Sequence, residues 1–248
     1  MGVLNVTPDS FSDGGCWLDP DAAVAHGLAM AAEGADVVDV GGESTRPGAA
    51  EVPADEERRR VVPVIEALAG RVRLSVDTRK PEVAEAALAA GATILNDVSA
   101  SLYEVAAAHG AGWVAMHMRG TPATMQQQAV YDDVVSEVRD FLLARADRAL
   151  AAGVTELWID PGLGFAKTTA HNLSLLRRLD ELVATGYRVL VGASRKSFIG
   201  ALTGDAPVDD RREGSLALAV WAMARGATMV RVHDVRATAQ AARLVAAA

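Results

Sequence analysis

Polar side chains stand at the ends of several short apolar runs in this chain, where they could act on a ligand. Asp77, Asn96 and Asp160 lie within or immediately after such a run, so we expect their side chains to be buried. A neutral polar group buried without a partner costs roughly 2–7 kcal/mol, and an isolated charge costs more. Groups of this kind that converge on one cavity require a ligand with several hydrogen-bond donors. The full set at such positions is Asn5, Asp39, Asp77, Asn96, His117, Asp160, Ser194 and His233.

Helix capping is the alternative role for these residues, because Asp, Asn and Ser are favoured at helix N-caps. We favour capping for Asp39 and regard it as a fair alternative for Ser194. It is a weak explanation for Asp77, Asn96 and Asp160, which lie too deep in their apolar runs.

Positive groups gather in two short segments of the C-terminal part of the chain. One contains Lys196, and the other contains Arg231 and His233. Because the formal net charge of the chain is −8, these local concentrations predict a site for an anionic ligand. For Arg195 a solvated surface position is an equal alternative.

Other charged residues are expected to serve the fold or the surface. The charged run 55–60 is typical of the solvated face of a helix. His26, His109 and His171 stand in or beside helical stretches, so we expect each of them to be structural or solvated.

A repeated sequence pattern at the junctions between segments indicates how the secondary-structure elements alternate. Helix-like segments end in a glycine, as at Gly34, Gly91 and Gly153, and a short apolar run follows within a few residues. Glycine just past the last helical residue is the usual left-handed cap, and apolar runs without polar alternation are typical of strands buried on both faces. The predicted strands are 1–4, 37–40, 74–76, 94–95, 113–116, 157–159, 189–191 and 229–232.

Helical periodicity fills the stretches between these strands. The apolar residues of 61–68 and 134–142 recur at helical spacing. Helix starts are predicted at Pro20 and Pro81, and at Asp210 as an N-cap with a glutamate three residues later.

Strands that alternate with helices in this way predict an α/β protein with a single (β/α)8 TIM barrel. Such a barrel needs about 250 residues, so we expect one domain over 1–248. Its catalytic groups lie at the C-terminal strand ends, and phosphate often binds after the last two strands. Long loops are predicted after the first and second strands, at 5–15 and 41–48, and loops of this kind can close over a site. A doubly wound open sheet is the structural alternative.

Composition narrows the class of protein further. The acidic net charge argues against broad nucleic-acid binding, which needs a basic face. No apolar stretch approaches the roughly 18 residues of a membrane span, and no signal peptide precedes the first apolar run, so we expect no membrane association. The single cysteine, Cys16, excludes an internal disulfide and fits a reducing, cytoplasmic location.

Taken together, these residues resemble the dihydropteroate synthases, a pterin-binding family of folate biosynthesis. The matching motifs are spread in order over nearly the whole chain, which makes the resemblance specific. They are 5–15, 41–48, 75–78, 96–99, 116–120, 160–167, 192–200 and 231–235.

The resemblance implies three neighbouring subsites. Asp160 would accept two parallel hydrogen bonds from the flat amino and ring N–H edge of a pterin. The implied pterin-binding residues are Asp77, Asn96, Met116, Asp160 and Lys196. The implied diphosphate-binding residues are Asn5, Arg46, Arg231 and His233. The implied 4-aminobenzoate-binding residues are Phe11, Thr45, Pro47, Phe165, Lys196 and Ser197.

The resemblance also implies a transferase reaction and its cofactor. A (7,8-dihydropterin-6-yl)methyl diphosphate would lose diphosphate in an SN1-like step, and 4-aminobenzoate would then attack to give 7,8-dihydropteroate. Mg²⁺ is the implied cofactor, with Asn5 as a ligand, because it prefers amide and phosphate oxygens. Sulfonamides would compete with 4-aminobenzoate. A homodimer is also implied, with Trp221 and Met223 as candidates either for its interface or for packing on the barrel.

Two departures and two alternatives accompany the resemblance. The loop 97–102 is shorter than is usual in the family, which leaves the start of the next helix open, and the chain begins directly in its first predicted strand. A pterin-dependent methyltransferase of the corrinoid type is one alternative, although it has no use for the anion site. A non-catalytic paralogue that only binds pterin is the other.

Overall fold

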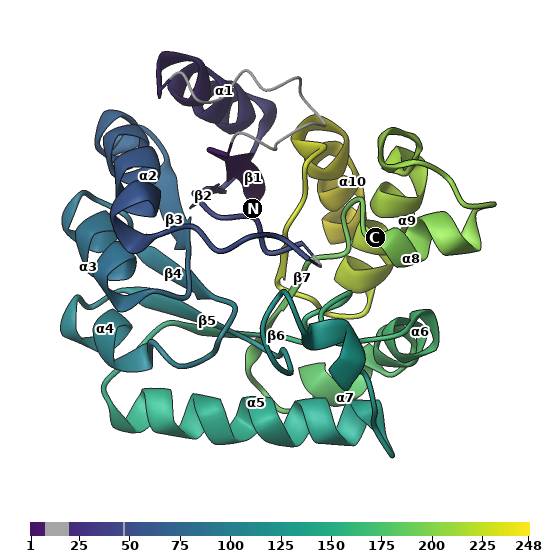
Figure 1. Ribbon diagram of the computed structural model, residues 1–248. Helices are drawn as coiled ribbons and strands as arrows, with labels where there is room; N and C mark the ends of the chain where they lie inside the picture. The colour runs from purple at the N-terminus through teal and green to yellow at the C-terminus, as the bar shows by residue number, and fades with distance from the viewer. Residues whose placement is uncertain (8–19, 47) are drawn as a thin grey trace.

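The computed structural model describes residues 1–7, 20–46 and 48–248, and it contains a strand at each of the predicted positions. Neighbouring strands pair in parallel, and their order in the sheet follows their order in the sequence. Figure 1 shows the strands at the centre of the molecule, with the helices around them. The strands are β1 (Gly2–Asn5), β2 (Val37–Gly41), β3 (Arg73–Asp77), β4 (Ile94–Asp97), β5 (Gly112–Met116), β6 (Leu157–Asp160), β7 (Arg188–Val191) and β8 (Met229–Val230).

Backbone hydrogen bonds join the first strand to the segment that follows the last one. The amide of Val3 donates to the carbonyl of Val232 at 3.0 Å, and the amide of Val232 donates to the carbonyl of Met1 at 2.9 Å. The sheet is therefore curled until its edges meet, which is consistent with the predicted TIM barrel. A doubly wound sheet needs a reversal of strand order, so the sequential order excludes that alternative.

Two of the three predicted helix starts are confirmed. Pro20 and Pro81 are the first residues of their helices. The N-cap predicted at Asp210 is wrong, because Asp210 belongs to a 3-10 turn and Arg211 precedes the next helix. The helices are α1 (Pro20–Glu33), α2 (Ala54–Leu68), α3 (Pro81–Ala89), α4 (Tyr103–Ala108), η3 (Met125–Gln128), α5 (Val134–Ala151), α6 (Thr169–Arg177), α7 (Leu179–Val183), α8 (Ser197–Leu202), η4 (Val208–Asp210), α9 (Arg212–Ala224) and α10 (Val235–Ala247).

The inward-facing side chains change from apolar to polar along the strands. Val37, Ile94 and Trp158 lie near the starts of their strands, in an apolar cluster that also contains residues of β5 and β7. Side chains alternate between the two faces of a strand, so the residues two positions further on also face inward. These residues are Asp39, Asn96 and Asp160. The apolar cluster thus closes one end of the barrel, and polar groups occupy the C-terminal end.

A larger apolar cluster fills the space between the strands and the helices. Met223 of α9 packs against this cluster, so packing on the barrel is the role that the structure gives it. Trp221 on the same helix is 44% exposed, and its indole N–H donates to the carbonyl of Leu176 at 3.2 Å. The guanidinium of Arg225 lies 4.3 Å from the centroid of the Trp221 ring.

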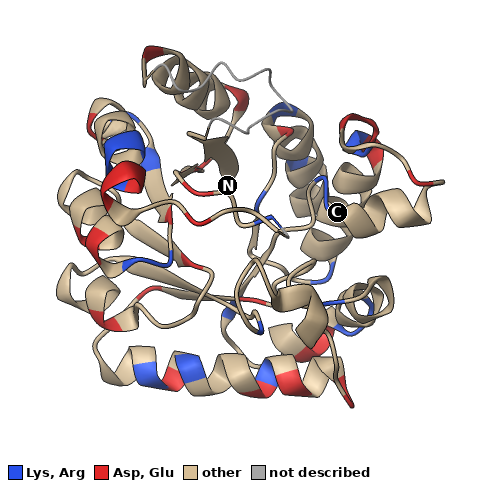
Figure 2. Cartoon of the chain, in the orientation of Figure 1, with Lys and Arg blue, Asp and Glu red and all other residues tan. Residues whose placement is uncertain are grey.

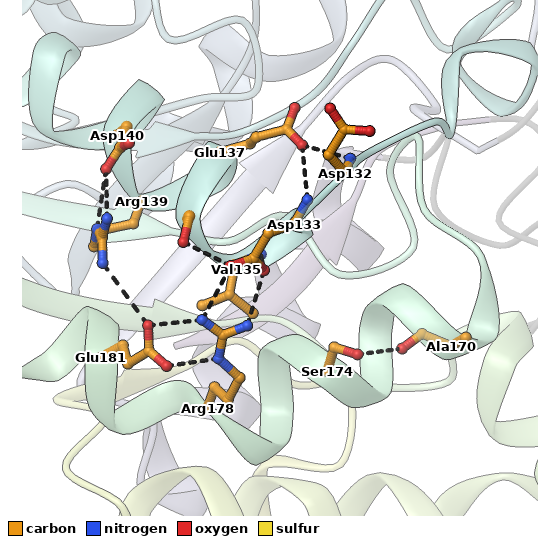
Figure 3. A network of polar contacts seen from close by, with 11 residues as sticks. Asp132, Asp133, Val135, Glu137, Arg139, Asp140, Ala170, Ser174, Arg178 and Glu181 are labelled. Atoms are coloured by element: carbon orange, nitrogen blue, oxygen red, sulfur yellow. Dashed lines mark hydrogen bonds and ion pairs between the residues drawn. The ribbon is translucent and has the colours of Figure 1, made fainter.

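Charged residues of both signs are spread over the outer helices (Figure 2). Figure 3 shows one network at the start of α5. Asp133 caps this helix by accepting from the amide of Val135 at 3.1 Å, and it pairs with Arg178 at 2.8 Å. Arg178 also pairs with Glu181 at 2.6 Å. These contacts tie α5 to the connection between α6 and α7.

A single carboxylate organises the short loop after β4. Asp97 is fully buried and accepts from the amides of Ser101 and Leu102, both at 2.7 Å. It also accepts from the indole N–H of Trp113 at 3.2 Å. These contacts place the start of α4 at Tyr103 and settle the boundary that the sequence leaves open.

Residues 6–19 connect β1 to α1, and residues 42–53 connect β2 to α2. Of the residues singled out in the sequence, Phe11, Cys16 and Pro47 lie outside the described residues. Within the described ranges, no helix has the length and apolarity needed to cross a membrane.

Candidate active site

A cavity of about 520 Å³ lies at the C-terminal ends of the strands. It brings together every predicted site residue that the structure describes, although these residues come from distant parts of the sequence. What each residue binds remains a prediction, and Phe11 and Pro47 lie outside the described residues. The predicted residues that line the cavity are Asn5, Thr45, Arg46, Asp77, Asn96, Met116, Asp160, Phe165, Lys196, Ser197, Arg231 and His233.

Arg231, predicted to bind diphosphate, contacts two buried carboxylates. Its Nη2 donates to Oδ2 of Asp77 at 2.8 Å, and its Nε donates to Oδ2 of Asp39 at 2.6 Å. Burial raises the pKa of Asp77 to about 7, against the opposing effect of the Arg231 charge. The guanidinium predicted to hold diphosphate therefore lies directly against a carboxylate predicted to hold pterin.

The predicted capping role of Asp39 is wrong. The residue lies inside β2 and is fully buried, whereas α2 begins only at Ala54. Its Oδ2 accepts from Arg231 and also from Nδ2 of Asn96, at 3.0 Å. The two-residue spacing from Val37 is the sequence signal that could have placed Asp39 inside the barrel.

Asp160 is held by the tight turn that follows β6. The amide of Gly162 donates to Oδ1 of Asp160 at 2.7 Å, and Gly162 has a φ of +64°. An added Cβ at Gly162 would lie 2.0 Å from the carbonyl oxygen of His117, so only glycine fits there. Oδ2 of Asp160 lies 4.0 Å from the position of a Cβ on Gly192, which lines the cavity. Burial raises the pKa of Asp160.

Lys196 stands between the predicted pterin and aminobenzoate residues. It is the N-cap residue of α8, and Ser197 is the first residue of that helix. Its Nζ lies 4.0 Å from the centroid of the Phe165 ring. Burial lowers the pKa of Lys196 to about 8, and the charge of Arg231 acts in the same direction.

Ser194 orients a histidine and does not cap a helix. Its hydroxyl lies 3.0 Å from Nδ1 of His233 and also accepts from the backbone amide of His233 at 3.2 Å. Burial and the nearby Arg231 lower the pKa of His233 to about 3, so the imidazole is neutral. Arg195, for which the sequence leaves a solvated surface position as an equal alternative, forms an ion pair with Asp234 at 3.1 Å.

Sequence reasoning gave no role to Lys167, which is buried beside the cavity. Its Nζ donates to the carbonyl of Phe165 at 2.9 Å and to that of His117 at 3.3 Å, and it lies 3.0 Å from Nδ1 of His117. Burial lowers the pKa of Lys167 to about 7 and that of His117 to about 2. Lys167 thus ties the loop that carries Phe165 to the end of β5.

Buried ion pairs anchor the loop that carries Thr45 and Arg46. The Glu43 carboxylate accepts a hydrogen bond from the amide of Val52 at 2.9 Å, and this bond connects the two ends of the loop. Glu43 also forms an ion pair with Lys80 at 3.0 Å. Lys80 also pairs at 2.5 Å with Glu57, which is fully buried. The prediction that 55–60 is a solvated face is therefore wrong for Glu57, because that side chain points into the ion-pair cluster.

The described residues contain no group of three or more His, Cys, Asp or Glu that could hold a metal by itself. Asn5 lines the cavity close to Asp77: a Cβ on Gly41 would lie 3.6 Å from Oδ1 of Asn5 and 3.8 Å from Oδ2 of Asp77. Mg²⁺ is usually bound by one or two protein oxygens together with substrate phosphates and water. This donor set fits an ion that is shared with a diphosphate.

Known proteins match this chain along its length. A family model described as pterin binding enzyme matches residues 1–233. The dihydropteroate synthase of Mycobacterium leprae (strain TN) is 52% identical over 261 residues, which cover 100% of this chain and 92% of the relative.

Solved structures agree with the sequence match. The Yersinia pestis dihydropteroate synthase in a sulfonamide drug complex has a TM-score of 0.94 and 47% identity, covering 100% of this chain and 92% of that one. The Xanthomonas albilineans dihydropteroate synthase with 4-aminobenzoic acid has a TM-score of 0.92 and 50% identity, covering 100% and 91%. The chain belongs to the dihydropteroate synthase family of pterin-binding enzymes.

Proposed function

We propose that the protein is a transferase that condenses (7,8-dihydropterin-6-yl)methyl diphosphate with 4-aminobenzoate to give 7,8-dihydropteroate and diphosphate. The observation that carries the proposal is the convergence in one cavity of buried acceptors with cationic side chains and a neutral imidazole that can donate a hydrogen bond. Asp77, Asn96 and Asp160 suit a donor-rich ring, and Lys196, Arg231 and His233 suit an anion. The complexes of the two relatives with a sulfonamide and with 4-aminobenzoic acid support the same assignment.

The pterin ring would lie on the acceptors at the strand ends. Oδ1 of Asp77 is buried and has no hydrogen-bond partner among the described residues, so a ligand donor would satisfy it. The carboxylate of Asp160 would receive the amino and ring N–H edge in two parallel hydrogen bonds. Lys196 would donate to the pterin carbonyl oxygen, and Met116 would contact the ring.

The diphosphate would lie among Asn5, Arg46, Arg231 and His233. Mg²⁺, held by Asn5 together with phosphate oxygens, would neutralise part of the leaving group's negative charge. Arg231 and Arg46 would add positive charge where negative charge develops as the C–O bond breaks, which lowers the barrier to departure. The electrons of that bond leave with the diphosphate, and the pterin ring delocalises the cation on the exocyclic methylene.

The aniline nitrogen of 4-aminobenzoate would then form the new C–N bond and release one proton. A neutral aniline is already nucleophilic, so this step needs position more than a strong base. The aromatic ring would lie against Phe165, with Thr45 beside it and with Ser197 near the carboxylate. Phe11 and Pro47 complete the proposed set, and the loops after β1 and β2 would keep water from the cation.

One experiment tests the proposal directly. Purified protein is mixed with the pterin diphosphate, 4-aminobenzoate and Mg²⁺, and dihydropteroate is sought by mass spectrometry. The proposal predicts product that requires both substrates. Tight binding of the pterin diphosphate without product would favour a non-catalytic pterin-binding protein. Transfer of a methyl group from a methylated pterin would favour the corrinoid-type methyltransferase.

We also propose a cytoplasmic homodimer. The single cysteine of the sequence supports the location. The exposed ring of Trp221 on α9 supports an apolar contact between subunits. Light scattering of the wild-type protein and of Trp221→Glu tests the dimer, because a charge in that contact should raise the monomer fraction.

A further inference from the structure

We infer that Asp39 is a positioning residue, whose carboxylate lies beneath the cavity and sets the orientation of two side chains in it, Asn96 and Arg231. The inference rests on the proposed function, which assigns Asn96 to the pterin and Arg231 to the diphosphate. Its physical basis is that one buried oxygen receives hydrogen bonds from both side chains.

Asp39 lies below the ligand space. It is fully buried, and it is absent from the residues that line the cavity, whereas Asn96 and Arg231 both line it. The strand that carries Asp39, β2, lies between β1 and β3 in the sheet. Asn96 belongs to β4 and Arg231 follows β8, so both contacts cross the interior of the barrel. Asp39 can therefore set the position of a ligand only through these two residues.

The first contact determines which end of the Asn96 amide faces the cavity. A carboxylate accepts hydrogen bonds and donates none. Nδ2 of Asn96 donates to Oδ2 of Asp39 at 3.0 Å, so the amide group is held with its nitrogen toward Asp39. The amide oxygen is then the atom available to a ring N–H of the pterin. Without Asp39 the amide could rotate and present donors to a donor.

The second contact determines which edge of the Arg231 guanidinium faces the cavity. Nε donates to Asp39 at 2.6 Å and Nη2 donates to Asp77 at 2.8 Å, so one edge of the group lies on two carboxylates. The Nη1 edge is left for the diphosphate. When a pterin N–H competes for Asp77, Asp39 is the partner that keeps Arg231 in place.

The variant Asp39→Asn distinguishes a positioning role of Asp39 from a purely electrostatic effect of its charge on diphosphate binding. A negative charge beside Arg231 weakens the attraction for an anion, so its removal alone would tighten diphosphate binding. Positioning predicts the opposite: the amide oxygen can still accept from both side chains, but Arg231 loses its ionised partner, so the dissociation constant of the pterin diphosphate should rise by about threefold or more, and by less than in Asp39→Ala. A pterin that lacks phosphates should lose less affinity, because the amide oxygen can still accept from Asn96. Unchanged or tighter binding of the diphosphate would overturn the inference.

Asp39→Ala removes both contacts, so it should weaken the phosphate-free pterin as well as the diphosphate. At saturating pterin diphosphate, the KM for 4-aminobenzoate should stay near the wild-type value, whereas a general loosening of the fold would raise it too. Ser75→Ala is the matched control. Ser75 is fully buried in β3, is the register partner of Asp39, and has a hydroxyl without a partner in the described part of the chain. Its ligand affinities should match those of the wild type.

A measurement on the wild-type protein decides the case in which the Asp39 variants do not fold. In a crystal structure with pterin and diphosphate bound, Nε of Arg231 and Nδ2 of Asn96 should remain within hydrogen-bond distance of Asp39. Departure of either group overturns the inference. Wild-type turnover is measured in parallel, so that failure of the proposed reaction is distinguished from failure of the Asp39 assignment, which is read from ligand binding.

Discussion

The ammonium group of Lys196 lies 4.0 Å from the centroid of the Phe165 ring, so a buried cation rests on an aromatic face inside the cavity. Lys196 precedes α8, and Phe165 lies in the loop after β6. The pair therefore joins two loops at the point where the proposed pterin and aminobenzoate subsites meet. Substitution of either residue should therefore weaken the binding of both substrates, to different degrees.

Phe165→Leu should raise the KM for 4-aminobenzoate more than it weakens pterin binding. The variant loses an aromatic surface and a cation–π contact worth roughly 0.5–2 kcal/mol. Steady-state kinetics with each substrate varied in turn measures the difference. Trp221→Leu is the control, since it removes a similar contact with Arg225 on the outer surface of α9 and should leave both constants unchanged.

Asp160→Asn should weaken pterin binding by about 2–4 kcal/mol, because a donor then faces the donors of the ligand. Isothermal calorimetry on the folded variant measures the loss. Asp97→Asn is a useful comparison, because Asp97 is also a buried aspartate but lies outside the cavity lining and serves the loop after β4. Unchanged pterin affinity in Asp160→Asn would remove this residue from the pterin subsite.

The pH dependence of kcat/KM for the pterin diphosphate should be bell-shaped. Burial raises the pKa of Asp77 to about 7, so its negative charge, which makes both oxygens acceptors, is gained as the pH rises through that value. Burial lowers the pKa of Lys196 to about 8, so its positive charge is lost above that value. Because kcat/KM reports the groups of the free enzyme, the rising limb belongs to Asp77 and the falling limb to Lys196. An alkaline limb that persists in Lys196→Met contradicts the second assignment.

His233→Ala should weaken the pterin diphosphate strongly and a phosphate-free pterin very little. Ser194→Ala should have a smaller effect of the same kind, because it removes the hydroxyl that orients the imidazole but leaves the ring. Fluorescence titration with both ligands gives, for each variant, the ratio of its dissociation constant to that of the wild type. Equal losses for the two ligands in His233→Ala would return this residue to a structural role.

A sulfonamide should compete with 4-aminobenzoate and not with the pterin, since it carries the same aniline. Its binding should tighten when pterin, Mg²⁺ and diphosphate are added, if the loops after β1 and β2 complete the aminobenzoate subsite only then. Phe11→Ala should weaken both aromatic ligands and leave pterin binding nearly intact. Equally tight sulfonamide binding to the bare protein contradicts this order of assembly.

The eight strands could be predicted from the sequence because each is a short apolar run, and six of these runs follow a glycine that ends a helix-like segment. Strands buried on both faces, such as Val37–Gly41, leave a local pattern that needs no tertiary information. The residues of the cavity were also found, because polar side chains within apolar runs, such as Asp77 and Asn96, are costly unless they serve a purpose.

The partners of these residues could not be predicted, because they depend on which inward side chains meet across the barrel. Residue type alone predicts a helix cap at Asp39, yet the curled sheet brings this side chain to Asn96 and Arg231. Glu57 belongs to a charged run that looks solvated, but its position on α2 turns it toward Lys80. Local pattern determined where the elements lie and which residues face the interior. Contacts between residues distant in sequence, formed only when the sheet closes, decided what those residues bind within the protein.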